Sequence, residues 1–267
     1  MDNTPTPVTK EEIGIDRKYN LLWSAPERCA GGARNEGIEH AKGVWLIFAD
    51  ADDYFAPGAF TVFDAHYDEL YDVIYFSSTG VYDDTGEYSN RCEPYPTMVR
   101  KYEEGDYNSD LPFRLSFDVP WSKMIRKSLV VNQNIRFDEV RAANDVIFSL
   151  RTGFLAQSVY AYNKLVYICT VSKGSLTQQR SFDATYSRFK VELRRSRFLK
   201  DNNLADYQRS IMVYFLQSVR SKPQSIFRLC LDIVKYRQNP LIGCGNWFRT
   251  FANSLKKRKT ENKYIVK

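Results

Sequence analysis

The sequence predicts an α/β fold followed by a basic, helical C-terminal region. The first observation is a run of good helix formers, Ala33 to Ala41, which glycines precede and Gly43 ends. The second is a row of five apolar residues, Val44 to Phe48, with the pattern of a strand buried on both faces of a largely parallel sheet. The third is helical patterning with basic faces beyond residue 186. A helix, a buried strand and a later helical region together predict the fold class.

Two adjacent glycines, Gly31 and Gly32, lie at the amino end of the predicted helix. Glycine has no Cβ, so it allows a backbone to approach another group closely. We therefore expect this end of the helix to lie against another segment of the chain.

Three carboxylates in four residues, Asp50, Asp52 and Asp53, follow the predicted strand directly. Carboxylates this close repel one another, and a divalent cation is the usual compensation. Hard oxygen ligands suit Mg²⁺ or Mn²⁺, which are commonly held by one or two carboxylates together with substrate phosphates. The pattern therefore indicates a phosphate-bearing substrate, and a solvated acidic turn is the alternative.

The string ARNEGIEHAKGVWLIFADADD, residues 33–53, resembles the core of glycosyltransferase family 2. Members of this family combine an ARN-x-G helix, a hydrophobic strand and a DxD motif in the same order. The resemblance implies a GT-A fold, which is a Rossmann-like mixed sheet with flanking helices, and a nucleotide-diphosphate-sugar donor. It also implies that Asp52 binds the Mn²⁺ or Mg²⁺ ion that bridges the diphosphate. The donor-binding residues it implies are Arg34, Asn35, Asp50 and Asp53, with Asp50 near the ribose.

A second matching segment begins at Pro120-Trp121-Ser122-Lys123, which resembles the family's W-x-K-L stretch, and ends near Asn144-Asp145. The resemblance implies that Asp145 is the catalytic base and that Asn144 lies on the acceptor side. Family members commonly have Glu where this chain has Asn144, so Asp145 has one fewer anion nearby to raise its pKa. The alternative is that either residue caps a helix. Trp121 would either stack on an acceptor sugar or pack in the core.

The resemblance covers roughly residues 2–180. We expect a glycosyltransferase domain over residues 1–186 and a basic helical region over residues 187–267, which hold 19 Lys or Arg against 5 Asp or Glu. Relatives place a strand, a helix and a second strand before the ARN helix, for which there is no room here. We therefore expect a truncation at the amino end that leaves Val44 to Phe48 with an unpaired, apolar edge.

The remaining pattern predicts a further set of elements. They are a helix over 59–70, a strand over 72–77, a hairpin over 81–88, a loop over 89–112, a strand pair over 158–171 and an amphipathic helix over 225–237.

The five cysteines share no zinc-like spacing, so we expect free thiols and a cytoplasmic location. No apolar run approaches the ~18 residues that a membrane-spanning helix needs. Near the C-terminus, an apolar stripe of Trp247, Phe248, Phe251 and Leu255 precedes four cations, Lys256-Lys257-Arg258-Lys259. Such a segment is typical of a peripheral contact with an anionic membrane, here the inner face of the plasma membrane.

The sequence thus predicts an inverting, metal-dependent glycosyltransferase. It would move a sugar from a nucleotide-diphosphate donor to a hydroxyl of a glycan or lipid-linked acceptor, in bacterial surface polysaccharide synthesis. The alternative is a truncated, non-catalytic chain or subunit that keeps the scaffold. We do not expect nucleic-acid binding, because the basic residues beyond 186 alternate with bulky apolar ones and the preceding domain is acidic.

Overall fold

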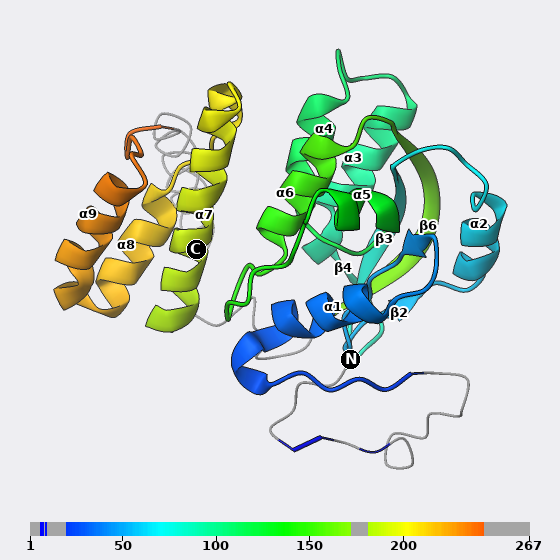
Figure 1. Cartoon of the computed structure of the whole chain (residues 1–267), viewed down its shortest axis with the longest axis horizontal. Helices are drawn as coiled ribbons and strands as arrows, with labels where there is room; N and C mark the ends of the chain where they lie inside the picture. Colours follow the sequence, from blue (N-terminus) through cyan, green and yellow to red (C-terminus); the bar gives the residue numbers. More distant parts are fainter. Residues whose placement is uncertain (1–5, 8, 10–19, 172–180, 243–267) are drawn as a thin grey trace, which may run out of the picture. The chain divides into compact units, whose positions relative to one another are not determined.

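The computed structural model describes residues 6–7, 9, 20–171 and 181–242 (Figure 1). The chain divides into two compact units, residues 1–179 and 180–267, and each is described by itself. Within the described ranges, none of the helices combines the length and the apolar character that a membrane crossing requires.

The first unit is built on a six-stranded mixed sheet with the strand order β1-β5-β3-β6-β2, to which β4 adds by pairing with β3. Its strands are β1 Trp45–Leu46, β2 Tyr54–Phe55, β3 Val73–Tyr82, β4 Tyr88–Ser89, β5 Lys123–Arg126 and β6 Val159–Val171. The two long strands, β3 and β6, pair in parallel along their length, with register irregularities around Ser77. Figure 1 shows β6 curving strongly around this part of the sheet.

Eight helical segments accompany the sheet in the described part of the first unit. They are η1 Pro26–Arg28, α1 Cys29–His40, α2 Ala59–Ala65, η2 Asn90–Cys92, α3 Pro94–Glu103, α4 Leu111–Ser116, α5 Lys127–Asn132 and α6 Val146–Leu155. Alternation along β3 sends side chains to two separate cores. Val73 and Tyr75 join the cluster under α3 to α6, whereas Ile74 and Phe76 join the cluster beside α2. Helices therefore cover both faces of the sheet (Figure 1).

Three of the expected elements are wrong in detail. The predicted loop over 89–112 contains α3, because Pro94 and Pro96 lie in the first helical turn, where the missing N–H groups have no intrahelical partner in any case. The predicted strand pair over 158–171 is a single strand, β6, held in parallel against β3. The helix predicted over 59–70 ends at Ala65, and Tyr67 is exposed beyond it.

The strand expected over Val44 to Phe48 is shorter and differently placed than predicted. Only Trp45–Leu46 pairs, and it pairs antiparallel with β5, so the expectation of a parallel strand buried on both faces is wrong. Val44 is 45% exposed. Among the described strands β1 has a neighbour on one side only, which matches the unpaired apolar edge predicted for this segment.

The second unit is helical where it is described. It contains α7 Phe182–Asp201, η3 Ala205–Tyr207, α8 Met212–Ser221, η4 Pro223–Ser225 and α9 Ile226–Lys235. Its core is a small cluster of Phe189, Leu193, Ile211 and Leu229. The domain boundary predicted between residues 186 and 187 falls inside α7, which begins at a Ser181 side-chain cap.

Candidate functional site

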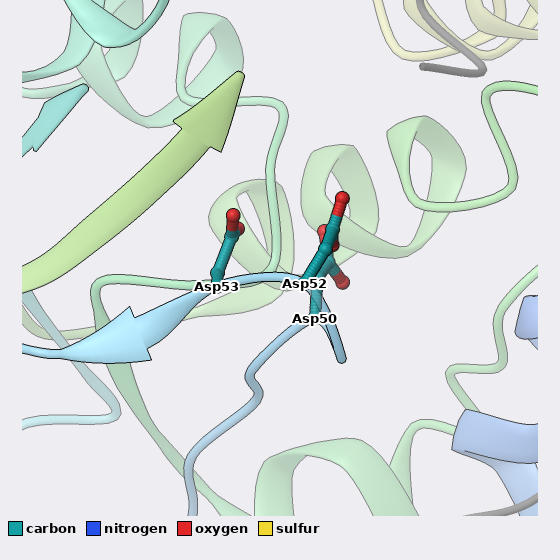
Figure 2. Close-up of side chains that lie close together, drawn as sticks. All are labelled: Asp50, Asp52 and Asp53. Atoms are coloured by element: carbon teal, nitrogen blue, oxygen red, sulfur yellow. The ribbon is translucent and has the colours of Figure 1, made fainter. Parts of the chain in front are cut away.

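The three acidic residues lie on the turn that joins β1 to β2. One carboxylate oxygen from each of Asp50, Asp52 and Asp53 lies within 4.8 Å of the others. Figure 2 shows the three side chains leaving this turn close together. Oxygens at this spacing can be ligands of a single divalent cation.

Two residues of β6 hold the acidic turn in place. The Tyr167 hydroxyl donates to Asp53 Oδ2 over 2.9 Å and accepts from the Asp50 amide over 2.8 Å. The Thr170 amide donates to Asp53 Oδ1 over 2.7 Å, and its hydroxyl donates to the Asp52 carbonyl. The turn is therefore fixed at both ends by a strand that the sheet itself makes rigid.

The three carboxylates consequently differ in their surroundings. Both oxygens of Asp53 accept hydrogen bonds from β6, and burial raises the pKa of Asp53 to about 6 against the effect of those bonds. Asp50 forms an ion pair with Arg34. The exposed side chain of Asp52 makes no hydrogen bond or ion pair within the described ranges. Asp52 is thus the carboxylate with both oxygens open to a ligand.

Arg34 connects the acidic turn to the start of α6. Its guanidinium pairs with Asp50 and donates to Asn144 Oδ1 over 2.7 Å. The Arg34 side chain is 17% exposed and that of Asp50 is 29% exposed, so this link between two distant segments is partly shielded from salt. The structure therefore brings together Arg34, Asp50 and Asn144, which are three of the predicted site residues.

Asp145 occupies the N-cap position of α6, but its side chain makes no capping hydrogen bond to that described helix. This geometry argues against the interpretation of Asp145 as a simple helix cap. Burial raises the pKa of Asp145 to about 6; the Arg34 guanidinium lowers it, and the Asp118 and Asp50 carboxylates raise it further. A carboxylate with a pKa this close to neutrality is suited to exchange a proton.

The other predicted site residues are buried. Asn35 donates to the Phe137 carbonyl and accepts from the Phe137 amide, so its amide group is occupied in fixing α1 to the neighbouring loop. Trp121 is 6% exposed and stacks on Tyr167 with ring centroids 5.2 Å apart. Trp121 therefore packs in the core, which is one of its two predicted roles, and supports the residue that holds the acidic turn.

The start of α1 confirms the expected close approach. A Cβ on Gly31 would lie 1.9 Å from the Asp138 carbonyl oxygen, so only glycine fits at this position. The same contact brings Gly31 near Asn144. Because Gly31 has no side chain, α1 can lie close enough to this segment for Arg34 to contact both Asp50 and Asn144.

A pocket of about 470 Å³ lies between α1 and the segment that leads into the acidic turn. Its walls include Ala33, Ile38 and Phe48, and Arg34 and Asp50 contribute its charged groups. An apolar cavity with a few convergent polar groups is typical of a small-molecule site.

Sequence reasoning missed the contributions of Tyr167, Thr170 and Lys123. Lys123 is buried, donates to the Phe117 carbonyl over 2.8 Å and lies over the rings of Tyr75 and Phe117. Burial lowers its pKa to about 7. The signal for Tyr167 was only a tyrosine-rich strand, because nothing in the sequence registers β6 against the acidic turn.

The mixed sheet with helices on both faces is a GT-A fold, and the acidic turn follows its strand β1. The comparison with solved structures shows the same fold. One similar structure is TarS of S. aureus, residues 1–349, in a complex with UDP-GlcNAc. It superimposes with a TM-score of 0.55 at 18% identity, covering 82% of this chain and 60% of that one. A second crystal structure of TarS 1–349 gives a TM-score of 0.53 at 20% identity, covering 82% of this chain and 61% of that one. The predicted fold class is confirmed.

The model of glycosyl transferase family 2 matches residues 2–132, so the resemblance predicted from the ARN helix and the acidic turn is confirmed. Two curated relatives are EpsH of Bacillus subtilis, named as a glycosyltransferase, with 21% identity over 78% of this chain, and YibD of Escherichia coli, named as an uncharacterized glycosyltransferase, with 27% identity over 69%. This chain spans 61% and 55% of the lengths of those relatives. Asn144 and Asp145 lie beyond the matched residues.

Proposed function

We propose that this chain is an inverting glycosyltransferase that uses a nucleotide-diphosphate sugar. The observation that carries the proposal is the link made by Arg34, which joins the acidic turn to the segment of Asp145. A sugar transfer needs a diphosphate-binding group and a base on either side of one anomeric carbon. The acidic turn and Asp145 would supply these two groups, from segments far apart in the sequence.

The donor would occupy the pocket beside α1. The similar TarS structure is a complex with UDP-GlcNAc, which supports a nucleotide-sugar donor here. Arg34 and Asp50 line the pocket and would contact the nucleotide, with Asp50 at the ribose. Asn35 would act indirectly, because its bonds to Phe137 fix the helix that carries Arg34.

A divalent cation, Mn²⁺ or Mg²⁺, fits the acidic turn by the spacing of its carboxylate oxygens. Asp52 would hold the ion, because its carboxylate is the one without a partner in the described part of the chain, and Asp53 would orient the turn through Tyr167 and Thr170. When bound, such a cation would neutralise charge on the departing diphosphate.

Asp145 would act as the general base. As the acceptor hydroxyl oxygen attacks the anomeric carbon in line, Asp145 takes its proton and the bond to the diphosphate breaks. A single displacement of this kind inverts the anomeric configuration. Asn144, held by Arg34, would line the acceptor side. Trp121 would support the site from the core and would not contact the sugar.

The acceptor would be a glycan or a lipid-linked saccharide in bacterial surface polysaccharide synthesis, at the cytoplasmic face of the plasma membrane. The relatives named as glycosyltransferases support the reaction class, and the basic C-terminal region supports contact with an anionic membrane. The stripe of Trp247, Phe248, Phe251 and Leu255, with the cations that follow it, lies outside the described residues. The two-domain organisation is part of the same proposal, with the boundary before α7 and not at residue 186.

One observation favours a second candidate, a non-catalytic chain that keeps the scaffold. Among the described strands β1 is paired on one side only, and Val44 beside it is exposed. A donor pocket with an unpaired strand in its wall would bind a nucleotide less firmly than a closed one.

Release of nucleotide diphosphate from a panel of nucleotide sugars, with Mn²⁺ or Mg²⁺ and a saccharide acceptor, tests both candidates. We expect release from one donor to depend on the metal and on the acceptor. The panel is run on this chain and on a version extended upstream. Release by neither version would contradict the enzymatic proposal, and release by the extended version alone would favour a scaffold role for this chain.

A further inference from the structure

Helix α9 is apolar on two sides, and only one of them packs within the described part of its unit. Leu229 is fully buried in the cluster with Phe189 and Ile211. On the other side, Phe227, Leu231 and Val234 are 81%, 69% and 73% exposed, and Cys230 is exposed as well. Their spacing at i, i+3, i+4 and i+7 places them on one face. We call Phe227, Cys230, Leu231 and Val234 the α9 stripe.

The α9 stripe differs from the faces expected from the sequence. The amphipathic helix predicted over 225–237 has Ile226, Leu229, Cys230 and Ile233 on one apolar face by their spacing. The structure divides that set, since Leu229 is buried whereas Cys230 is exposed. Leu241, 74% exposed, adds apolar surface just beyond the helix. A row of exposed, large apolar side chains is unusual for a surface that water alone covers.

The sequence around the α9 stripe is mostly cationic. Residues 220–242 contain five cations and one acid. Lys222 and Arg228 lie over the rings of Phe182 and Tyr186, and Arg228 also donates to the Tyr186 hydroxyl. The acid, Asp232, accepts a hydrogen bond of 2.7 Å from the Tyr186 hydroxyl and falls on the side away from the stripe. Lys235, adjacent to Val234, and Arg237 are exposed. The α9 stripe is therefore apolar and has two exposed cations, Lys235 and Arg237, at its C-terminal end.

We propose that the α9 stripe binds the surface of an anionic phospholipid bilayer. An exposed apolar helix face can enter the boundary between headgroups and acyl chains, while bordering lysines and arginines contact anionic headgroups. Each cation near such a surface strengthens partitioning about five-fold. The α9 stripe would thus make the membrane contact that was proposed for the basic C-terminal region. Binding to the membrane by this stripe does not depend on sugar transfer.

The test is flotation of the full chain with vesicles of phosphatidylglycerol and phosphatidylcholine, compared with vesicles of phosphatidylcholine alone. We expect binding to the anionic vesicles that weakens with salt. Leu231→Gln with Val234→Gln should lower the bound fraction about ten-fold or more, because polar groups replace the inserted surface. Lys235→Gln with Arg237→Gln should weaken binding to anionic vesicles without altering the apolar side chains. Leu70→Gln with Leu165→Gln is the control, since both leucines are exposed on the first unit.

Unchanged binding by the Leu231/Val234 variant would overturn the proposal, as would equal binding of the wild type to both kinds of vesicle. A Trp247→Ser, Phe251→Ser variant that alone abolishes binding would assign the contact to the tail instead. If sedimentation shows self-association that the Leu231/Val234 variant removes, the stripe is an interface between copies. Nucleotide release with a water-soluble acceptor, which the stripe variants should leave unchanged, separates failure of this proposal from failure of the proposed function.

Discussion

The Tyr167 hydroxyl and the Asp53 carboxylate form a hydrogen bond of 2.9 Å that ties the acidic turn to the longest strand of the described sheet. The same hydroxyl accepts from the Asp50 amide, so one side chain fixes two positions of the turn. The Asp53 carboxylate therefore differs from that of Asp52, because its oxygens already accept hydrogen bonds from β6. Asp53 maintains the shape of the turn, and Asp52 remains available to a ligand.

The first prediction is that Tyr167→Phe weakens Mn²⁺-dependent binding of a nucleotide diphosphate. Loss of the hydroxyl removes one of the two hydrogen bonds to the Asp53 carboxylate and the bond from the Asp50 amide. The less firmly held turn must then be ordered when the metal binds, at a cost of about 1 kcal/mol or five-fold in affinity. Titration calorimetry measures the affinity. The control is Tyr75→Phe, because the buried Tyr75 hydroxyl has no hydrogen-bond partner among the described residues. Equal affinity in the Tyr167 variant and the wild type would show that the turn is held without this bond.

The second prediction concerns the carboxylate of Asp52. Asp52→Asn should abolish metal-dependent donor binding and leave the fold intact, because it removes one of three crowded charges. The metal-free variant should be as stable as the wild type or slightly more so, in thermal unfolding without metal. Asp83→Asn, which changes an exposed carboxylate on the β3–β4 turn, is the matched control. Retention of Mn²⁺-dependent binding by Asp52→Asn would refute the assignment of the metal ligand.

The sequence was sufficient for the parts of the site that are local in the chain. The ARN helix and the acidic turn follow from composition and order over 21 residues, 33–53. The need for glycine at position 31 was also predicted, and its contact with the Asp138 carbonyl confirms it. The partner segment was not predictable, because glycine indicates a close approach without indicating to what.

Contacts that depend on strand register could not be predicted. The placement of Tyr167 beneath the acidic turn requires that β6 run parallel to β3 with irregularities near Ser77. A shift of one residue would exchange the two faces of β6 and remove Tyr167 from the site. The short, antiparallel β1 has a similar explanation: an apolar run shows that residues are buried, and it does not show which neighbour pairs with them.

The third prediction is that Asp145→Asn spares donor binding and lowers turnover by about 10² to 10⁴-fold, as expected for loss of a general base. In the wild type, turnover should fall as pH decreases through about 6, where Asp145 becomes protonated. Rates across pH at saturating donor measure both effects. Activity within a few-fold of wild type in Asp145→Asn would make the residue a structural one.

Variants of Arg34 test whether Asp145 is the group whose pKa sets the acid limb of the pH profile. Its guanidinium lowers the pKa of Asp145, so Arg34→Gln should raise that pKa and move the acid limb of the pH profile to higher pH. Arg34→Lys retains the positive charge and should move the limb less. An acid limb that does not respond to Arg34→Gln would indicate that another group titrates.

The fourth prediction is that Lys123 makes stability rise with pH above neutrality. In the folded protein burial lowers the pKa of Lys123 to about 7, whereas the unfolded value is about 10.4. Below pH 7 both states carry the proton, and the folded state bears the full cost of a buried charge. Between about pH 7 and 10.4 the unfolded chain binds one proton more than the folded one, so the free energy of unfolding increases with pH, by at most about 1.4 kcal/mol per unit.

Lys123→Met should remove this increase. Urea unfolding of both proteins at about pH 7 and 9 measures it, with the exposed Lys42→Met as control. If the wild type and Lys123→Met change in parallel, the folded protein keeps Lys123 charged, and its bond to the Phe117 carbonyl and the rings of Tyr75 and Phe117 would be what offsets the burial.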